Sequence, residues 1–267
     1  MSWLETVVLA LIQGITEFLP VSSSAHLILP SAVFGWQDQG LAFDVAVHMG
    51  TLAAVMLYFR QDIVSLTGGW FRQVGGRGAS SESKLAWAVI LATVPAVVFG
   101  YILKDAIETY LRSALVIAIT TIVFGIALGL ADRKRGSRPL AGLRWSDALL
   151  IGLAQAVALI PGTSRSGITM TAAMFLGLDR EASARFSFLL SIPLILAAGG
   201  YAALQLVTSA APVPWPQIIT GTLLSFLSAL ACIHLFLRFL QSIGFMPYVW
   251  YRMVLGIGLL CFLGFSS

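Results

Sequence analysis

Two short segments place polar and ionisable residues beside helix-breaking prolines in an otherwise apolar chain. The first runs from Gln13 to His26 with the sequence QGITEFLPVSSSAH, and the second covers residues 155–169 with the sequence QAVALIPGTSRSGIT. Each has a hydroxyl cluster after its proline and a serine three residues beyond it. Ionisable groups are costly within hydrocarbon, so they indicate a functional site. Because one segment supplies Glu17 and His26 and the other supplies Arg165, the sequence predicts one composite active site.

The second segment has the residue types that bind an oxyanion. A helix that restarts after Pro161 would present free N–H groups and the positive end of its dipole to an anion. Arg165 adds a fork of donors that matches phosphate oxygens, and Thr169 lies one helical turn further on. The other candidate phosphate-binding residues of this segment are Gly162, Ser164 and Ser166. The alternative is a helix break capped by hydroxyls, with Arg165 extending to the membrane interface.

The first segment supplies candidate nucleophiles and bases. If a helix begins near Ser22, then Ser23 and His26 share one face, and either could attack, with His26 also a candidate general acid. Glu17 could orient His26, act as a base, or hold a divalent cation that bridges phosphate oxygens. The structural alternatives are a serine cap beside a core histidine, and a plain ion pair between Glu17 and Arg165.

The remaining ionisable residues in apolar stretches are predicted to be structural. Asp44 and His48 form an i, i+4 pair at the start of one stretch, and we expect them to position the helix or the site rather than to catalyse. Glu5, His234 and Arg252 are isolated and are expected to be structural or interfacial.

The composition predicts an integral membrane protein. The chain has 267 residues, of which 58% are hydrophobic and only 10% are charged, and its mean hydropathy is +0.90. Soluble domains carry about 25% charged residues. The apolar stretches leave no room for a sizeable soluble domain, so residues 1–267 are expected to form a single membrane domain. The net charge of +4 does not indicate a nucleic-acid partner, because the basic residues gather in two loops.

Six stretches approach the roughly 20 apolar residues that a membrane span requires. They are Leu41–Phe59, Leu85–Leu103, Ala114–Leu130, Phe186–Val207, Ile218–Leu237 and Tyr248–Phe265. Two shorter apolar segments, Leu4–Leu19 and Leu149–Ile160, end at prolines and are predicted to be re-entrant. The predicted fold class is an all-α integral membrane protein with about six transmembrane helices and two re-entrant helical hairpins.

The chain divides into two halves of the same layout, residues 1–131 and 145–267, joined by a basic cytoplasmic linker at 132–144. Each half has one re-entrant element and three spans, and this odd number of spans predicts an inverted-topology repeat with a site near its axis. Twelve Lys and Arg residues fall on one side, in loops 60–84, 132–144 and 238–246 and in the turn 179–185. The uncharged connection 209–216 falls on the other side. Both termini and the active site are therefore expected to face outward.

At these residues the chain resembles the bacterial undecaprenyl-diphosphate phosphatase family, also called the bacitracin-resistance protein family. The resemblance is carried by Gln13 to Glu17 leading into Pro20-Val21-Ser22-Ser23, and by the stretch PGTSRSGIT at 161–169. It also takes in residues 43–50, 186–190 and 247–252, so it covers nearly the whole chain.

The resemblance implies a bacterial inner-membrane phosphatase that converts a C55 polyprenyl diphosphate to the monophosphate. That reaction recycles the lipid carrier for peptidoglycan and other wall polymers and confers bacitracin resistance. The partners implied are the polyprenyl diphosphate and membrane lipids, with a divalent cation, Mg or Ca, as cofactor. The family's functional residues fall here on Glu17, Ser23, His26, Ser164, Arg165 and Thr169.

One residue departs from the commonest family pattern, and two rival functions are compatible with parts of the sequence. Gln13 stands where many members carry a carboxylate, which weakens any metal site and leaves Glu17 nearly alone. The soluble-type lipid phosphatase pattern would need a histidine and an aspartate where this chain has Thr171 and Phe175, so it is excluded. A lipid or anion transporter or flippase built on the same inverted repeat is the alternative. A homo-oligomer is left open.

Overall fold

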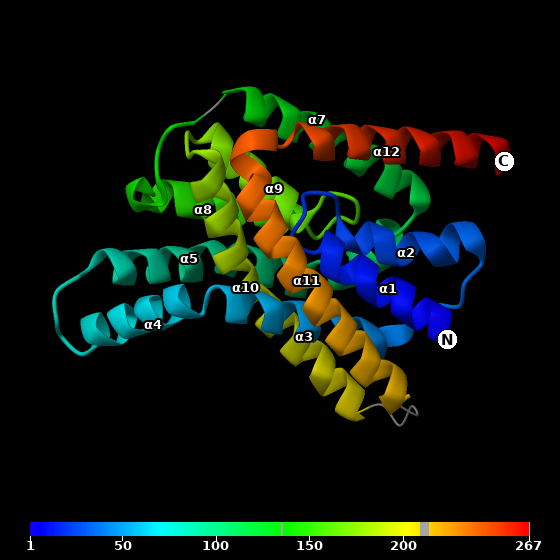
Figure 1. Ribbon diagram of the computed structural model, residues 1–267, viewed down its shortest axis with the longest axis horizontal. Helices are drawn as coiled ribbons and strands as arrows, with labels where there is room; N and C mark the ends of the chain where they lie inside the picture. Colours follow the sequence, from blue (N-terminus) through cyan, green and yellow to red (C-terminus); the bar gives the residue numbers. More distant parts are fainter. Residues whose placement is uncertain (135, 209–213, 267) are drawn as a thin grey trace.

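The computed structural model (Figure 1) describes residues 1–134, 136–208 and 214–266. Arg135 of the basic linker and residues 209–213 of the uncharged connection lie outside the described residues, so those parts of the loop assignments are not addressed by the structure. In chain order the described residues form twelve α-helices and one short 3-10 turn: α1 Trp3–Thr16, α2 Ser23–Phe34, α3 Gly40–Tyr58, α4 Arg60–Val74, α5 Ser81–Ile102, α6 Lys104–Tyr110, α7 Ala114–Lys134, η1 Leu140–Gly142, α8 Trp145–Val157, α9 Arg165–Phe175, α10 Arg180–Thr208, α11 Trp215–Ile243 and α12 Met246–Ser266.

Six helices in the described part of the chain are long and apolar enough to cross a membrane: α3, α5, α7, α10, α11 and α12. They coincide with the six predicted spans, and their ends differ from the predicted bounds by a few residues. Their outer faces carry large exposed apolar side chains such as Leu223, Leu227 and Val254, as expected of surfaces that face lipid. The prediction of a multi-pass, all-helical membrane protein is confirmed.

The two short apolar segments are each built as helix, break and helix. Helix α1 ends at Thr16 and α2 begins at Ser23, while α8 ends at Val157 and α9 begins at Arg165. Both breaks contain the proline that the sequence analysis identified, at Pro20 and Pro161. A proline removes a backbone donor and clashes with the preceding turn, so a helix cannot run through it undisturbed.

The basic segment 60–84 is more ordered than a loop. Its first part is helix α4, which packs against α5 with Ile63 and Leu66 on the apolar core. Within the segment, only residues 75–80 lie outside helices. The amphipathic face of α4 explains the difference, because burying that face stabilises a helix in a segment that is polar overall.

Helix α11 lies directly against α1 and α3, as Figure 1 shows. Glycines on both partners allow this close approach. A Cβ added to Gly14 would lie 2.6 Å from the Ser225 carbonyl oxygen, and one added to Gly50 would lie 2.4 Å or less from groups of Thr222 and Ser225. Helices in lipid gain no hydrophobic driving force from association. Close van der Waals packing at small residues stabilises their contacts instead. This packing fixes the orientation of α1 and therefore the position of the break that follows it.

The two breaks are held at the centre of the bundle. Helix α9 contacts α7, α8 and α10, while α2 contacts α1 and α7. Phe18, which follows the last turn of α1, is fully buried and packs edge-on against Phe188 of α10, with ring centroids 5.3 Å apart. The aromatic contact of Phe18 therefore fixes the backbone next to Glu17 at the start of the first break.

Candidate active site

The two breaks share an unusual backbone conformation. Ser22 has φ 75° and Ser164 has φ 70°, the only positive φ values of non-glycine residues in the described chain. Each is the N-cap residue of the helix that follows its break. Their hydroxyls also match, with Ser22 Oγ 3.2 Å from Ser24 Oγ and Ser164 Oγ 3.3 Å from Ser166 Oγ. A left-handed serine costs about 1–3 kcal/mol and persists only where its surroundings enforce it.

A fully buried arginine on α12 enforces both breaks. Arg252 donates from Nη1 to the carbonyl oxygens of Pro20 at 3.1 Å and Thr163 at 3.0 Å, and from Nη2 to that of Gly162 at 2.9 Å. It also donates to the carbonyls of Thr120 and Thr121 on α7. The sequence analysis expected Arg252 to be structural or interfacial, and the structure places it in the interior. Its guanidinium supplies donors to carbonyl oxygens that a helix break leaves without helical partners.

Direct bonds also link the segments. Ser166 Oγ, on α9, donates to the Leu19 carbonyl oxygen in the first break at 2.8 Å. Thr120 Oγ1 of α7 donates to the Pro161 carbonyl oxygen in the second break at 2.7 Å. Residues 147 positions apart are thus held in register by hydrogen bonds as well as by packing.

The predicted composite centre forms where the breaks meet. Arg165 Nη2 donates to Glu17 Oε1 at 2.9 Å, and Glu17 Oε2 accepts from Ser23 Oγ at 2.7 Å and from Gln13 Nε2 at 2.9 Å. Only 7% of the Glu17 side chain and 12% of the Arg165 side chain are exposed. The Arg165 guanidinium thus compensates the charge of a carboxylate that is almost closed off from solvent.

A cavity of about 320 Å³ opens onto this centre. Its polar wall contains Glu17, Ser23, Ser164, Arg165 and the buried Gln155. Its apolar wall comes from α3 and α10 and comprises Leu41, Val45, Leu194, Ile195, Ala198 and Ala202 among others. A charged floor beside an aliphatic wall suits an anion that carries a hydrocarbon tail.

The structure assigns the two histidines near the site differently from the sequence analysis. His26 does not line the cavity: its Nδ1 bonds to the Ser22 carbonyl oxygen at 2.7 Å and its Nε2 to Tyr251 Oη at 2.5 Å. His48 does line the cavity, together with Asp44, and its Nε2 lies 3.8 Å from Glu17 Oε2. Sequence reasoning assigned His48 only a positioning role, and its i, i+4 spacing from Asp44 was the one signal that it belonged near the site.

Three of the predicted phosphate ligands do not line the cavity. Thr169 Oγ1 is 2.7 Å from Ser187 Oγ on α10 and bonds to the Arg165 carbonyl oxygen at 2.9 Å. Ser166 Oγ donates to the Leu19 carbonyl oxygen in the first break. Gly162 has φ 87°, and its carbonyl oxygen accepts a hydrogen bond from Arg252. These three shape the loop that carries Arg165, while Ser164 and Arg165 themselves line the cavity.

The donor set does not fit a protein-held divalent cation. Mg²⁺ and Ca²⁺ are held by several oxygen ligands, usually including more than one carboxylate. Glu17 is already paired with a guanidinium, and Gln13 presents its amide nitrogen to it. Asp44, the other carboxylate that lines the cavity, accepts a hydrogen bond from Gln39. The described residues contain no cluster of three or more His, Cys, Asp or Glu able to hold a metal.

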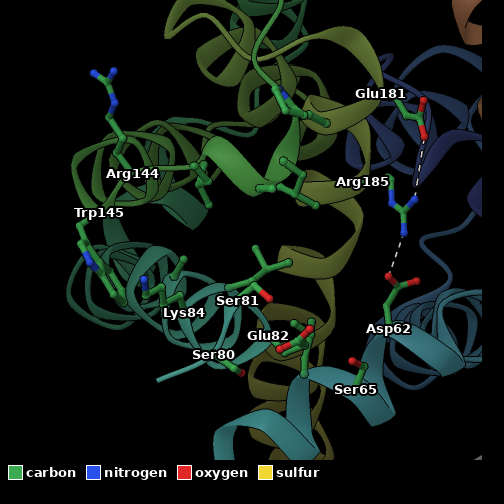
Figure 2. Close-up of a pocket in the computed structure, with 18 of the residues that line it drawn as sticks. Asp62, Ser65, Ser80, Ser81, Glu82, Lys84, Arg144, Trp145, Glu181 and Arg185 are labelled. Atoms are coloured by element: carbon green, nitrogen blue, oxygen red, sulfur yellow. Dashed lines mark hydrogen bonds and ion pairs between the residues drawn. The ribbon is translucent and has the colours of Figure 1, made fainter. Parts of the chain in front are cut away.

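A larger cavity, of about 730 Å³, lies near the other end of α10 (Figure 2). It is bordered by the starts of α5, α8 and α10, and Arg185 there is paired with Asp62 at 2.8 Å and Glu181 at 3.9 Å. No histidine lines it, and its charged lining combines the carboxylates of Asp62, Glu82, Asp179 and Glu181 with the cations of Lys84, Arg144 and Arg185. Glu17, Ser23 and Arg165, which join the two breaks, line only the smaller of these two cavities, so the smaller cavity is the candidate active site.

Comparison with known proteins shows the family of this chain. The family described as bacitracin resistance protein BacA matches residues 6–258. The chain belongs to this family. Among BacA-family relatives, it is 66% identical over 263 residues to an undecaprenyl-diphosphatase of Hahella chejuensis, covering 98% of this chain and 99% of that protein. It is 59% identical over 272 residues to an undecaprenyl-diphosphatase of Colwellia psychrerythraea, covering 98% of this chain and 100% of that protein.

Proposed function

We propose that this protein is an undecaprenyl-diphosphatase of the bacterial inner membrane, which hydrolyses the C55 polyprenyl diphosphate to the monophosphate and phosphate. The observation that carries the proposal is the cluster of Ser23, Glu17 and Arg165 on the wall of a cavity with an apolar side. It joins a hydroxyl, a base and a phosphate-binding cation within direct hydrogen-bond distance. The full-length relatives named as undecaprenyl-diphosphatases support the same substrate.

Ser23 is the proposed nucleophile. Its Oγ–H already points to Glu17 Oε2, so the carboxylate can take the proton as Oγ attacks the terminal phosphorus. The bond from phosphorus to the bridging oxygen then breaks, and the lipid monophosphate leaves with its electron pair. Arg165 and Ser164 line the cavity and would neutralise charge on the transferring group. His26 is less suited to attack, because both of its ring nitrogens are engaged.

The prenyl tail would leave the cavity along its apolar wall. That wall is formed by α3 and by residues 194–202 of α10. Leu196 and Leu204 on the same helix are exposed at the surface that faces lipid. The protein then needs to enclose only the diphosphate, and a tail of C55 length can remain in the bilayer.

We also propose that the site faces the outer half of the membrane. Arg60 follows α3 and Arg180 begins α10, so the positive-inside rule places these helix ends at the cytoplasm. The cavity lies at the opposite ends, along residues 41–48 and 194–202. On α10 this is at least about 20 Å from Arg180. Both termini would then face outward.

The matching breaks support an inverted-topology repeat within one membrane domain of residues 1–267. Ser22 and Ser164 occupy equivalent places after Pro20 and Pro161 and share the same rare φ. Two re-entrant hairpins related in this way would bring their breaks together at the repeat axis. The halves would be residues 1–131 and 145–267.

Any requirement for Mg²⁺ or Ca²⁺ would come from binding of the ion to the diphosphate of the substrate. Since the donor set does not suit a resident ion, we propose that any cation enters with the substrate and not through a preformed protein site. Equilibrium dialysis of the substrate-free protein should then show no stoichiometric binding of either ion.

The test of this function is phosphate release from C55 polyprenyl diphosphate by purified protein in detergent. Wild type should release phosphate, and Ser23→Ala should lose it by at least about 100-fold, since no other group replaces the nucleophile. Ser242→Ala, which alters an exposed hydroxyl far from the cavity, is the matched control and should behave as wild type. No release by folded wild type would refute the proposal and favour lipid or anion transport.

A further inference from the structure

His48 is a proton-transfer group that the first half of the reaction does not use. Its side chain is 34% exposed and lines the same cavity as Ser23 and Glu17. Its Nε2 lies 3.8 Å from Glu17 Oε2, the oxygen to which Ser23 donates at 2.7 Å. The imidazole thus borders the position at which a phosphate on Ser23 would sit.

A backbone contact fixes the tautomer of this ring. His48 Nδ1 lies 2.7 Å from the Asp44 carbonyl oxygen. A carbonyl oxygen can only accept, so Nδ1 carries the hydrogen, and in the neutral ring Nε2 presents its lone pair to the cavity. The 3.8 Å separation from Glu17 is too long for a direct hydrogen bond, so Glu17 does not occupy this lone pair.

The other two histidines of the chain are placed differently. Both ring nitrogens of His26 are bonded, to the Ser22 carbonyl and to Tyr251. His234 is on the exposed face of α11, with its ring 6.3 Å from that of Tyr58. Of the three histidines, only His48 lines the cavity.

We infer that His48 is the general base for hydrolysis of a phosphoserine formed on Ser23. This inference rests on the proposed function. Nε2 takes a proton from water, the water oxygen bonds to phosphorus, and the bond from phosphorus to Ser23 Oγ breaks. The released electron pair returns to Oγ, which recovers the proton held by Glu17. Phosphate leaves, and the imidazolium gives its proton to solvent, which restores the starting enzyme.

The inference is tested by rapid-quench kinetics of His48→Gln with C55 polyprenyl diphosphate. The amide fills the site without supplying a base. We expect a burst of one lipid monophosphate per enzyme, a steady-state rate at least roughly 100-fold below wild type, and phosphoserine at Ser23 by peptide mass spectrometry. Added imidazole should speed loss of the phosphate from His48→Ala. His234→Ala is the matched control and should turn over as wild type without accumulating phosphoserine.

The outcomes separate this inference from the function on which it rests. A steady-state rate of His48→Gln equal to that of wild type would refute a role for His48. Loss of the burst together with turnover would also refute the assignment, because the first half-reaction should not need His48. Absence of phosphate release by wild type would instead refute the proposed function itself.

Discussion

Arg252 is the residue on which the geometry of both breaks most depends, and Arg252→Met tests that dependence at nearly constant volume. In the described structure, the Pro20 and Thr163 carbonyl oxygens accept hydrogen bonds from Arg252 alone, and the Gly162 carbonyl has only a longer bond from Thr121 besides. Each buried carbonyl left without a donor costs about 1–3 kcal/mol. For the first two, the expected loss in the free energy of unfolding is about 2–6 kcal/mol.

The loss can be measured as a fall in thermal stability in detergent. A loss of 1 kcal/mol lowers Tm by about 2–4 °C for a chain of this size, so Arg252→Met should melt at least about 4 °C below its parent. Cys232 is buried and reports unfolding by its reaction with a thiol-specific dye. The exposed Cys261 is first changed to Ser to remove its background signal. Turnover should fall as well, since both breaks lose a shared anchor.

The matched control is Arg238→Met, which removes an exposed guanidinium near the Phe239 ring and should change stability by less than about 0.5 kcal/mol. If Arg252→Met melts at the same temperature as that control and keeps full turnover, then the buried guanidinium does not hold the breaks and the reasoning is wrong.

Three further predictions follow from particular contacts. Gly14→Ala should lower Tm, because its Cβ would lie 2.6 Å from the Ser225 carbonyl oxygen of α11. Gly258→Ala is the control and should leave Tm unchanged, because its Cβ would meet open space. Equal melting temperatures of the two variants would contradict the close packing of α1 on α11. Tyr251→Phe removes the His26 hydrogen bond and should cost about 1 kcal/mol of stability while turnover stays within threefold, a result that a large loss of activity would overturn. Gln13→Glu adds a second carboxylate beside Glu17 and should lower the Mg²⁺ concentration needed for activity, measured in metal buffers; an unchanged titration would argue against it.

Hydropathy and spacing were sufficient to predict the spans and the meeting of Glu17 with Arg165. Both follow from local rules: apolar runs of span length form helices, and a lone buried carboxylate needs an opposite charge. The long helix α10 was predictable from its apolar run, and the breaks were predictable from Pro20 and Pro161, which cannot donate a helical hydrogen bond.

The surroundings of the two histidines were not predictable, because they depend on contacts between residues far apart in the chain. His26 turns to Tyr251, which is 225 positions away, and His48 meets Glu17 only after α3 packs beside α1. Thr169 fits the spacing of a phosphate ligand, but the packing of α9 on α10 turns its hydroxyl to Ser187. Sequence spacing predicts whether two residues share one face of a helix. The packing of neighbouring helices determines which residues that face contacts.

The most direct test of the composite site is a double-mutant cycle on Glu17→Gln and Arg165→Gln, read as kcat/KM for phosphate release from C55 polyprenyl diphosphate. Because the two side chains form one charged centre through a 2.9 Å contact, each single change should cost at least about 100-fold, and the double variant should lose little more than the worse single variant. Losses that simply multiply would show that the two segments act independently, and would contradict a shared site.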